Sequence, residues 1–214
     1  MKTVGRYDVS GLFEAQFEPG SNEQVLRNRL GIKSPRVMDD AEVRALEKAM
    51  VEFVGKYHAE HRFAASDIRE LHRRWLGGIY AWAGEYRQVN VSKGEFPFAA
   101  AALVPDLMHE FDRNVLARYT PCNFKDRAAV ARALAETHVE LVLIHPFRDG
   151  NGRAARMLSI LMALQAGLPL LNFSTIAEDK KQAYFSGVQA GLDKNYNPME
   201  RLFSEIIERS LAPS

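Results

Sequence analysis

Residues 145–156 read HPFRDGNGRAAR, and this short stretch decides how the rest of the chain can be arranged. It carries three arginines, an aspartate and a histidine, yet the segments before and after it are rich in apolar residues. Pro146 cannot continue a preceding helix, because proline lacks the backbone N–H that a helix needs. We therefore predict a helix that ends near Ile144, a short loop, and a second helix that begins near Asn151.

The loop between these two helices is suited to bind phosphate. Gly150 and Gly152 have no side chain that would keep a ligand away from the backbone N–H groups. These N–H groups belong to the start of the second helix, where the helix dipole places partial positive charge. The loop is thus a candidate phosphate site.

Two arginines strengthen this interpretation. Arg153 and Arg156 are three residues apart, so they lie on one face of the second helix. A cation in the first turn of a helix is disfavoured by about 0.3–1 kcal/mol, so a negative group should offset it. A nearby Asp or Glu would do so. A triphosphate would do so too, since guanidinium groups match the geometry of phosphate.

Two further residues of the stretch can take part in chemistry. Asp149 offers the carboxylate oxygen that Mg²⁺ prefers beside phosphates, and His145 can accept a proton near pH 7. The chain contains neither G-x-x-x-x-G-K-[ST] nor G-x-G-x-x-G, and the segment before the loop is predicted to be a helix. These observations argue against a P-loop and against a Rossmann nucleotide site.

At every fixed position the stretch resembles the Fic motif, H-x-F-x-[DE]-G-N-G-R-x-x-R. The resemblance extends to three flanking segments. PGSNEQVLRNRLGI, residues 19–32, is similar to the N-terminal segment common in bacterial Fic proteins. WAGEYRQVNVSKGEFPF, residues 82–98, resembles the region that leads into the β-hairpin flap of the family, and NPMERLFSEII, residues 197–207, resembles its last helix.

The resemblance implies that the chain moves AMP from ATP onto a Tyr, Thr or Ser hydroxyl of a target protein and releases pyrophosphate. His145 would deprotonate this hydroxyl, and Asp149 would bind Mg²⁺. Tyr184 would stack on adenine, and Phe147 would be a core residue that fixes the loop. The residues that would bind the ATP phosphates are Gly150, Asn151, Gly152, Arg153 and Arg156.

Other activities stay open at this point. The Doc kinases of the superfamily carry a lysine near the second glycine of the motif, where this chain has Gly152, so nucleotidyl transfer is favoured over phosphoryl transfer. A Fic-type enzyme could also use another nucleotide or remove AMP. A Fic-type binding module without turnover is the remaining alternative, although such a module would be free to lose His145 or Asp149.

The spacing of apolar residues predicts an all-α fold with one small hairpin, and the resemblance implies that it is a Fic-type helical bundle. Residues 1–20 read as an irregular N-terminal arm and 21–214 as a single domain. The predicted helices cover 22–31, with Ser21 as its cap, 39–57, 67–75, with Ser66 as its cap, 99–117, 126–144, 151–166, 178–191 and 198–211.

The hairpin is predicted at residues 89–98, where apolar and polar residues alternate around a turn at Lys93 and Gly94. Its open edge would let an extended segment of the target protein pair with it, which would bring a hydroxyl over His145. The flap residues that we expect to dock the target are Val91, Ser92, Lys93, Gly94 and Phe96.

Many Fic proteins are inhibited by a helix that bears [ST]-x-x-x-E-[GN], whose Glu pairs with the second motif arginine, here Arg156. The pairs with this spacing or nearly so are Ser10 and Glu14, Ser66 and Glu70, Ser174 and Glu178, Thr175 and Asp179, and Ser204 and Glu208. None is followed by Gly or Asn. We therefore expect a separate, small antitoxin-like protein to inhibit a toxin-like enzyme; a C-terminal inhibitory helix with Glu208 is the alternative.

The composition agrees with a globular protein. The 214 residues are 47% apolar and 26% charged, which is enough to form a sizeable core. The net charge of +1 gives no general attraction to nucleic acid or to membranes, so we expect neither as a partner. Cys122 is the only cysteine, which excludes an intrachain disulfide, and the start of the chain does not resemble a secretory signal. We expect a cytoplasmic protein.

Overall fold

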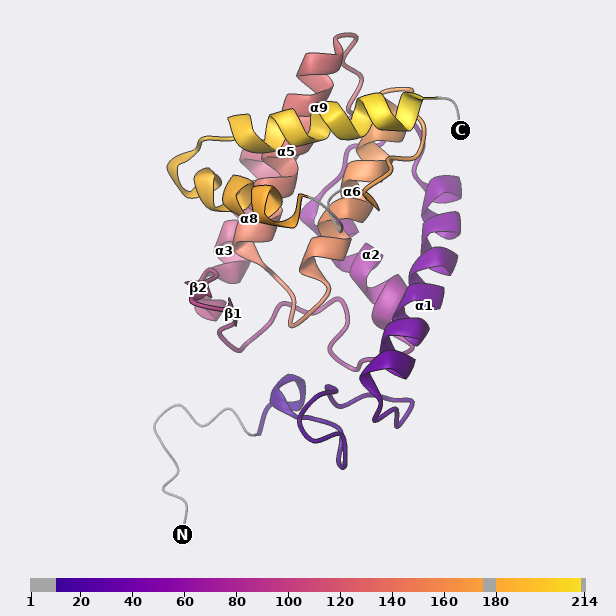
Figure 1. Cartoon of the computed structure of the whole chain (residues 1–214), viewed down its shortest axis with the longest axis vertical. Coiled ribbons are helices and arrows are strands. Elements are labelled where there is room, and N and C mark those ends of the chain that lie inside the picture. Colours follow the sequence, from indigo (N-terminus) through magenta and orange to yellow (C-terminus); the bar gives the residue numbers. More distant parts are fainter. Residues whose placement is uncertain (1–10, 175–179, 213–214) are drawn as a thin grey trace.

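A computed structural model describes residues 11–174 and 180–212 of the chain. Within them the fold is helical, with one two-stranded antiparallel sheet, as predicted (Figure 1). The principal elements are α1 (Pro35–Lys56), α2 (Ala65–Leu76), β1 (Ser92–Lys93), β2 (Phe96–Pro97), α3 (Val104–Phe111), α5 (Arg127–Ile144), α6 (Asn151–Gln165), α8 (Lys181–Ala190) and α9 (Asn197–Leu211). The shorter elements are η1 (Phe13–Ala15), η2 (Ala101–Leu103), η3 (Asp112–Leu116), α4 (Ala117–Tyr119) and η4 (Gly191–Asp193).

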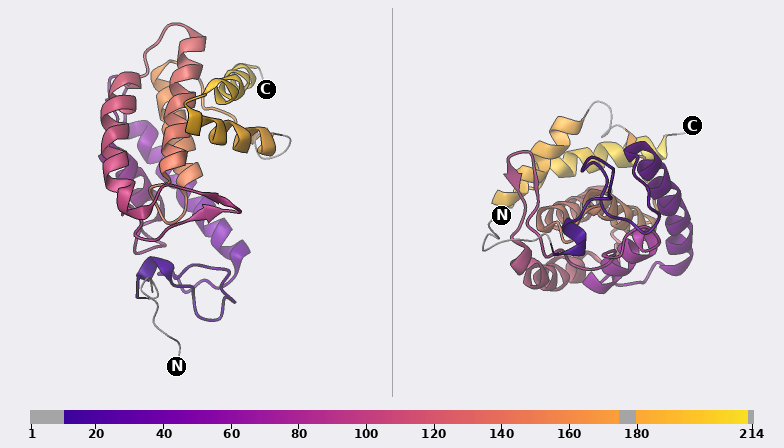
Figure 2. Two further views of the ribbon diagram at one scale, coloured as in Figure 1. Left: turned by 90° about the vertical axis from the view of Figure 1, so that its left-hand side faces the viewer. Right: turned by 90° about the horizontal axis from the view of Figure 1, so that it is seen from below.

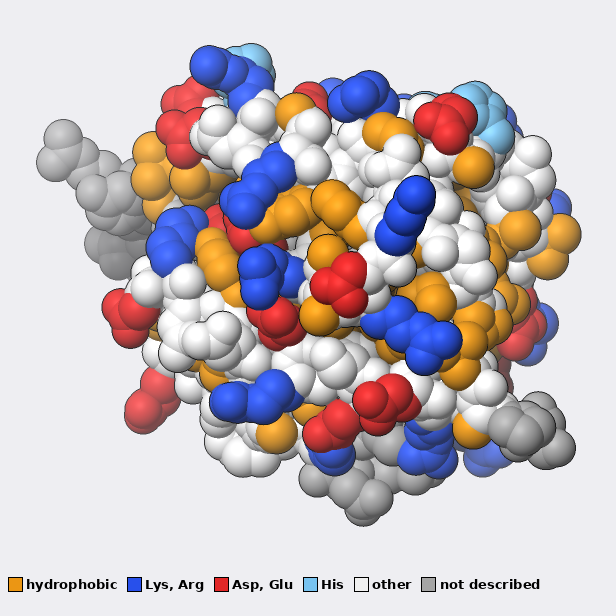
Figure 3. Space-filling model, turned by 90° about the horizontal axis from the view of Figure 1, so that it is seen from above, with side chains coloured by type: hydrophobic (Ala, Val, Ile, Leu, Met, Phe, Trp, Pro, Cys, Tyr) orange, Lys and Arg blue, Asp and Glu red, His pale blue; other side chains and the backbone are white. Residues whose placement is uncertain are grey.

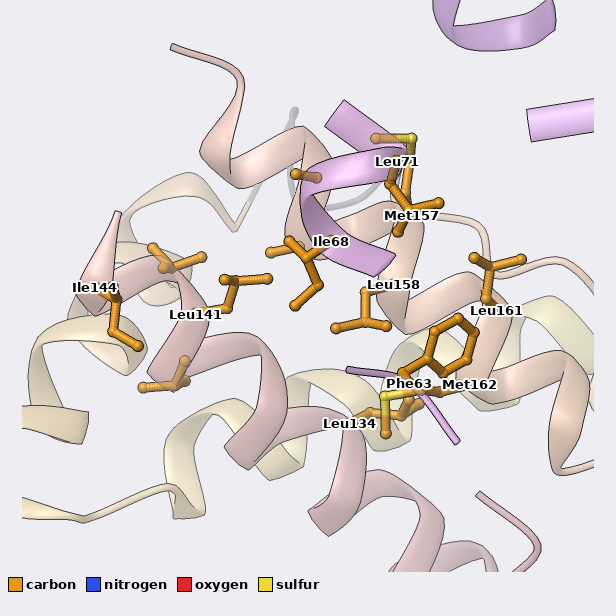
Figure 4. Close-up of a cluster of buried hydrophobic side chains, with 14 of the residues drawn as sticks. Phe63, Ile68, Leu71, Leu134, Leu141, Ile144, Met157, Leu158, Leu161 and Met162 are labelled. Carbon is orange, nitrogen blue, oxygen red and sulfur yellow. The ribbon is translucent and has the colours of Figure 1, made fainter. Parts of the chain in front are cut away.

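Helices α5 and α6 form the centre of the fold. They pack against each other, and α9 crosses them while α2 and α1 cover the other side of α6 (Figure 1). Figure 4 shows apolar side chains from α2, α5 and α6 that meet between these helices. Burial of such side chains supplies most of the free energy that holds a helical bundle together.

The loop that joins α5 to α6 lies at one end of this bundle. Figure 2 shows the hairpin and the N-terminal segment at the same end, with the hairpin beside the loop. The strands pair Ser92 with Pro97 and Lys93 with Phe96, so the predicted hairpin is confirmed, although its ladder is shorter than residues 89–98. Segments that are far apart in sequence therefore meet around residues 145–156.

Most predicted helices are confirmed with small shifts at their ends. Helix α1 begins four residues earlier than expected, since Pro35 at its first turn suits a helix start. Ser66 is not the cap of α2: the helix begins at Ala65, and the Asp67 carboxylate accepts a hydrogen bond from the Ala64 N–H. The predicted helix at 99–117 is divided into η2, α3, a π-helical turn (η3) and α4.

The prediction of a helix at 22–31 is wrong. The Ser21 hydroxyl does not cap a helix but exchanges hydrogen bonds with the backbone of Val25. Asn22 and Glu23 both have positive φ, which turns the chain back on itself. As a result, the backbone of 16–18 pairs with that of 25–27, including a bridge between Phe17 and Leu26.

One face of the molecule reflects the near-neutral charge of the chain. At the end of the molecule away from the N-terminal segment, basic, acidic and apolar side chains are intermixed (Figure 3). None of the described helices is both long enough and apolar enough to span a lipid bilayer.

Candidate active site

A cleft of about 940 Å³ opens beside the loop between α5 and α6. This volume lies within the range of small-molecule sites. Its walls come from the loop and the start of α6, from the hairpin, from α8, and from Phe17 and Leu26 of the N-terminal segment. The cleft therefore brings together residues from the motif, the flap and α8. Every residue predicted to act in catalysis, in phosphate or metal binding, or in target docking lines it except Gly94, which turns the hairpin with φ 59°.

His145 stands where α5 ends, in a left-handed backbone conformation with φ 52° and ψ 59°. Its Nδ1 lies 3.0 Å from the carbonyl oxygen of Val142, which can only accept, so Nδ1 carries the proton. The other ring nitrogen, Nε2, therefore has a free lone pair. The Phe98 ring stacks on the imidazole with centroids 3.6 Å apart. The arrangement is that of a neutral general base held in a fixed orientation.

Burial lowers the pKa of His145 to about 4. The nearby charges of Arg87 and Lys93 lower it further, whereas the hydrogen bond to Val142 and the charge of Asp149 raise it. The imidazole is thus already unprotonated at neutral pH. The sequence alone indicated a group that titrates near pH 7. In the structure the imidazole is instead a weaker base, but it is unprotonated, and so able to accept a proton, over a wider pH range.

The loop rests on the side chains of α2. His72 is fully buried and stacks on Phe147 with centroids 3.8 Å apart, which confirms Phe147 as the core residue that fixes the loop. The Nδ1 atom of His72 accepts a hydrogen bond from the Gly84 N–H, and Nε2 donates to the carbonyl oxygen of Asp149. Sequence reasoning placed no functional residue here.

Gly150 is required by its surroundings. Its φ is 81°, and an added Cβ would come within 2.8 Å of the Trp75 ring. By contrast, nothing lies within 4 Å of an added Cβ at Gly152. The Asn151 amide closes the loop, because it accepts from the Phe147 N–H and donates to the Phe147 carbonyl, both at 2.8 Å. Its buried side chain is therefore committed to the shape of the loop.

Arg153 already has an acidic partner. Its guanidinium donates to the buried Glu42 carboxylate on α1 at 2.5 Å and lies over the Trp75 ring. The other carboxylate oxygen of Glu42 accepts from the Tyr80 hydroxyl at 2.7 Å. For Arg153 the structure thus supplies the nearby Glu that was one of the two alternatives, and Glu42 is a residue that the sequence did not single out.

Arg156 differs from Arg153. It is half-buried and lines the cleft, and no carboxylate among the described residues forms an ion pair with it. Burial lowers the pKa of its guanidinium. A desolvated cation without an anionic partner favours the binding of an anion.

The Asp149 side chain is half-exposed at the loop. Its Oδ1 accepts a hydrogen bond from the Gly150 N–H and lies 3.9 Å from Arg153. No group of three or more possible metal ligands occurs among the described residues. One carboxylate suits Mg²⁺, which is commonly held by one or two carboxylates together with substrate phosphates.

Tyr184 is buried, and its hydroxyl lies 2.9 Å from Nε2 of His138, so much of this side chain belongs to the core. The neighbouring Phe185 also lines the cleft, with the Lys93 ammonium 4.2 Å from its ring centroid. The flap and α8 therefore meet through Lys93 and Phe185, a contact that the sequence pattern did not indicate.

Among the described residues, none of the candidate inhibitory glutamates forms an ion pair with Arg156. Glu14 accepts from the Gln88 N–H, and Glu70 pairs with Arg73 and Arg74. Glu208 on α9 is exposed. Ser10, Thr175, Glu178 and Asp179 lie outside the described residues.

The low pKa of His145 can be tested by NMR. We expect the imidazole of His145 to titrate well below pH 6.5, because burial opposes its charged form. Chemical shifts of the labelled ring, followed from pH 8 to pH 4 and assigned with the variant His145→Ala, give the midpoint. A midpoint at or above 6.5 would contradict the buried, neutral base.

Comparison with known proteins finds relatives of this chain. The model of the Fic/DOC family matches residues 62–163. A relative from Escherichia coli, called "Probable protein adenylyltransferase Fic", is 26% identical over 87% of this chain and 89% of its own length. "Protein adenylyltransferase Fic" of Drosophila ananassae is 27% identical over 96% of this chain, which spans 40% of that longer protein.

Solved structures share the fold. The Fic domain of a Bartonella effector protein from Bartonella sp. AR 15-3 has a TM-score of 0.74 at 23% identity and covers 93% of this chain and 94% of its own. BepC from Bartonella tribocorum, solved with bound AMPPNP, has a TM-score of 0.70 at 22% identity, with 90% and 96% covered. Residues 62–163 of the chain thus resemble the Fic/DOC family in sequence, and the chain shares the fold of solved Fic domains.

Proposed function

We propose that the chain is a protein adenylyltransferase, which transfers AMP from ATP to a Tyr, Thr or Ser hydroxyl of a target protein. The observation that carries this proposal is that Arg156 and His145 line the same cleft. Arg156 is a half-buried cation without a carboxylate partner among the described residues, and Nε2 of His145 is free to accept a proton. The name of the Escherichia coli relative and the AMPPNP bound to BepC support the same activity.

The chemistry follows from the two ends of the cleft. The phosphates would lie at the N-terminus of α6, where backbone N–H groups and the helix dipole favour anions. His145 Nε2 accepts the proton of the target hydroxyl while the hydroxyl oxygen forms a bond to the α-phosphorus. The bond from that phosphorus to the bridging oxygen breaks, and pyrophosphate leaves with the electron pair. Arg156 and Arg153 stabilise the charge on the phosphates.

We further propose that Mg²⁺ accompanies the nucleotide. Asp149 is the carboxylate at the loop that would hold the ion, with the phosphates as its other ligands. Bound Mg²⁺ would neutralise part of the charge of the triphosphate. The half-exposed position of Asp149, which leaves one carboxylate oxygen without a described partner, supports this assignment.

For the target protein we propose docking along the hairpin. β1 and β2 pair only with each other among the described strands, so each keeps an outer edge. An extended target segment can add to such an edge through backbone hydrogen bonds. The flap residues that line the cleft would position the hydroxyl over His145; they are Val91, Ser92, Lys93 and Phe96.

For inhibition we propose a separate antitoxin-like protein that inserts an acidic amphipathic helix. A groove of about 550 Å³ lies between α1, α6 and residues 170–173, and both Arg153 and Arg156 line it. Its apolar lining residues are Leu46, Met50, Met157, Ile160, Leu170, Leu171 and Phe173. An apolar groove with a cation that lacks a carboxylate partner among the described residues fits a helix with one apolar face and a Glu aimed at Arg156.

The activity is tested by incubating the purified chain with ATP and a bacterial lysate. We expect label from α-³²P-ATP, but not from γ-³²P-ATP, to enter protein. His145→Ala should reduce this transfer by about 10²–10⁴-fold, the usual contribution of a general base, while ATP binding and the melting temperature are retained. Incorporation of γ-label would indicate phosphoryl transfer instead, and full activity of His145→Ala would remove the base assignment.

The metal assignment is tested by calorimetry of ATP binding with and without Mg²⁺. Asp149→Ala should weaken the binding of Mg-ATP by more than it weakens the binding of free ATP, because only the former uses the carboxylate as a ligand. Equal losses under both conditions would show that Asp149 does not hold the ion.

The source of inhibition is tested with Glu208→Gly. Because Glu208 is exposed, we expect this variant to modify itself at the wild-type rate within about twofold, as surface substitutions rarely have larger effects. The wild-type chain alone should already be active. An inactive wild type and a gain of more than about tenfold in the variant would instead identify α9 as the inhibitory helix.

A further inference from the structure

Arg87 connects the flap to the catalytic loop. Its side chain is buried between the two, with 2% of the residue exposed. Nε donates to the carbonyl oxygen of His145 at 2.6 Å, and Nη1 donates to that of Val89 at 2.8 Å. Nη2 donates to the carbonyl oxygens of Ala99 at 2.5 Å and Ile144 at 3.3 Å. One guanidinium thus binds the chain just before β1, just after β2 and at the end of α5.

Two other contacts join the same segments. The backbone N–H of Arg87 donates to the Pro146 carbonyl at 2.9 Å. On the flap side, Phe98 stacks on the ring of His145. Both the backbone around His145 and its imidazole therefore contact the residues that flank the hairpin strands.

The buried charge and the hydrogen bonds of Arg87 indicate that this side chain does more than fill space in the core. Among the described residues no carboxylate forms an ion pair with Arg87; its buried charge is stabilised by hydrogen bonds to four carbonyl oxygens and, at longer range, by the charge of Glu14. Burial of a charge is costly unless it is well hydrogen-bonded. A guanidinium presents five N–H donors in a fixed planar fork and can bind four carbonyls at once, whereas a lysine ammonium has three donors on a flexible stem.

We propose that Arg87 is a positioning residue that couples the flap to His145, so that a hydroxyl docked on the hairpin is placed correctly against Nε2. This inference rests on the proposed function, since it explains how a docking surface and a base on different segments keep a fixed separation. His145 has a left-handed backbone conformation that is uncommon for a residue with a side chain. The bond from Arg87 to its carbonyl oxygen holds that conformation.

The proposal is tested with Arg87→Lys, which keeps the charge but not the fork. We expect the Kd of ATP to stay within about twofold, because Arg87 does not line the cleft. The turnover rate kcat for AMP transfer into the chain itself should fall by about ten- to a hundredfold, as expected for a small misplacement of reacting groups. Hydrogen exchange at 91–98 should become faster, since the flap loses its anchor.

A second variant covers the case in which Arg87→Lys does not fold. Phe98→Leu removes the stacked ring and leaves Arg87 in place, and it should lower kcat by a larger factor than any change in the Kd of ATP, which is measured as well because Phe98 lines the cleft. Arg62→Lys is the control for the same substitution: Arg62 is exposed and donates to the backbone carbonyl of Thr120, which belongs to neither the flap nor the loop. It should leave kcat and flap exchange unchanged.

Two results would overturn the proposal. One is an unchanged kcat and unchanged flap exchange in folded Arg87→Lys. The other is a loss of ATP affinity in proportion to the loss of kcat, which would indicate general damage to the site. If the wild type transfers no AMP at all, the proposed function fails, and hydrogen exchange at 91–98 in Arg87→Lys still decides whether Arg87 anchors the flap.

Discussion

Two stacked rings, His72 and Phe147, hold the motif loop in place, and the rest of the site is built on this contact. His72 can bind both the Gly84 N–H and the Asp149 carbonyl only as a neutral imidazole with the proton on Nε2. Burial lowers its pKa to about 4, which secures that state. Its folded pKa lies below the usual value of 6.5, so the stability that it contributes is present above pH 6.5 and is lost as the pH falls towards 4.

The residues of the motif loop have different structural roles. Asn151 and Phe147 fix its shape, whereas Asp149 and the backbone of the glycines stay open to the cleft. The two arginines have different surroundings, although both match the motif. Arg153 is neutralised by Glu42, which leaves Arg156 as the cation that most needs an anion.

Much of the site could be predicted from the sequence because it is local. Residues 145–156 contain the proposed base, the candidate metal ligand, the candidate anion-binding loop and both arginines, and proline and glycine mark the ends of the helices around them. The residues that were missed act across the fold. Glu42, His72 and Arg87 are separated from the motif by more than fifty residues, and their spacing carries no pattern that identifies a partner.

The secondary structure, too, could be predicted where it depends on local sequence and not where it depends on distant contacts. Helices with a regular apolar face, such as 126–144, were predicted closely, because that face must be buried. The segment at 22–31 was not, since its shape depends on two residues with positive φ and on pairing with 16–18 rather than on its own periodicity. The π-helical turn at η3 and the early start of α1 likewise depend on packing and on helix-end chemistry that apolar spacing does not record.

The close approach of Gly150 to Trp75 has a consequence for how this site can change over time. A side chain at 150 meets the indole, and a smaller residue at 75 would remove the surface on which the Arg153 guanidinium lies. Neither position can be altered first without weakening the loop or the arginine. Because Gly150 also has φ 81°, which disfavours any side chain, a smaller residue at 75 would not by itself allow a change at 150, and we expect position 150 to stay glycine.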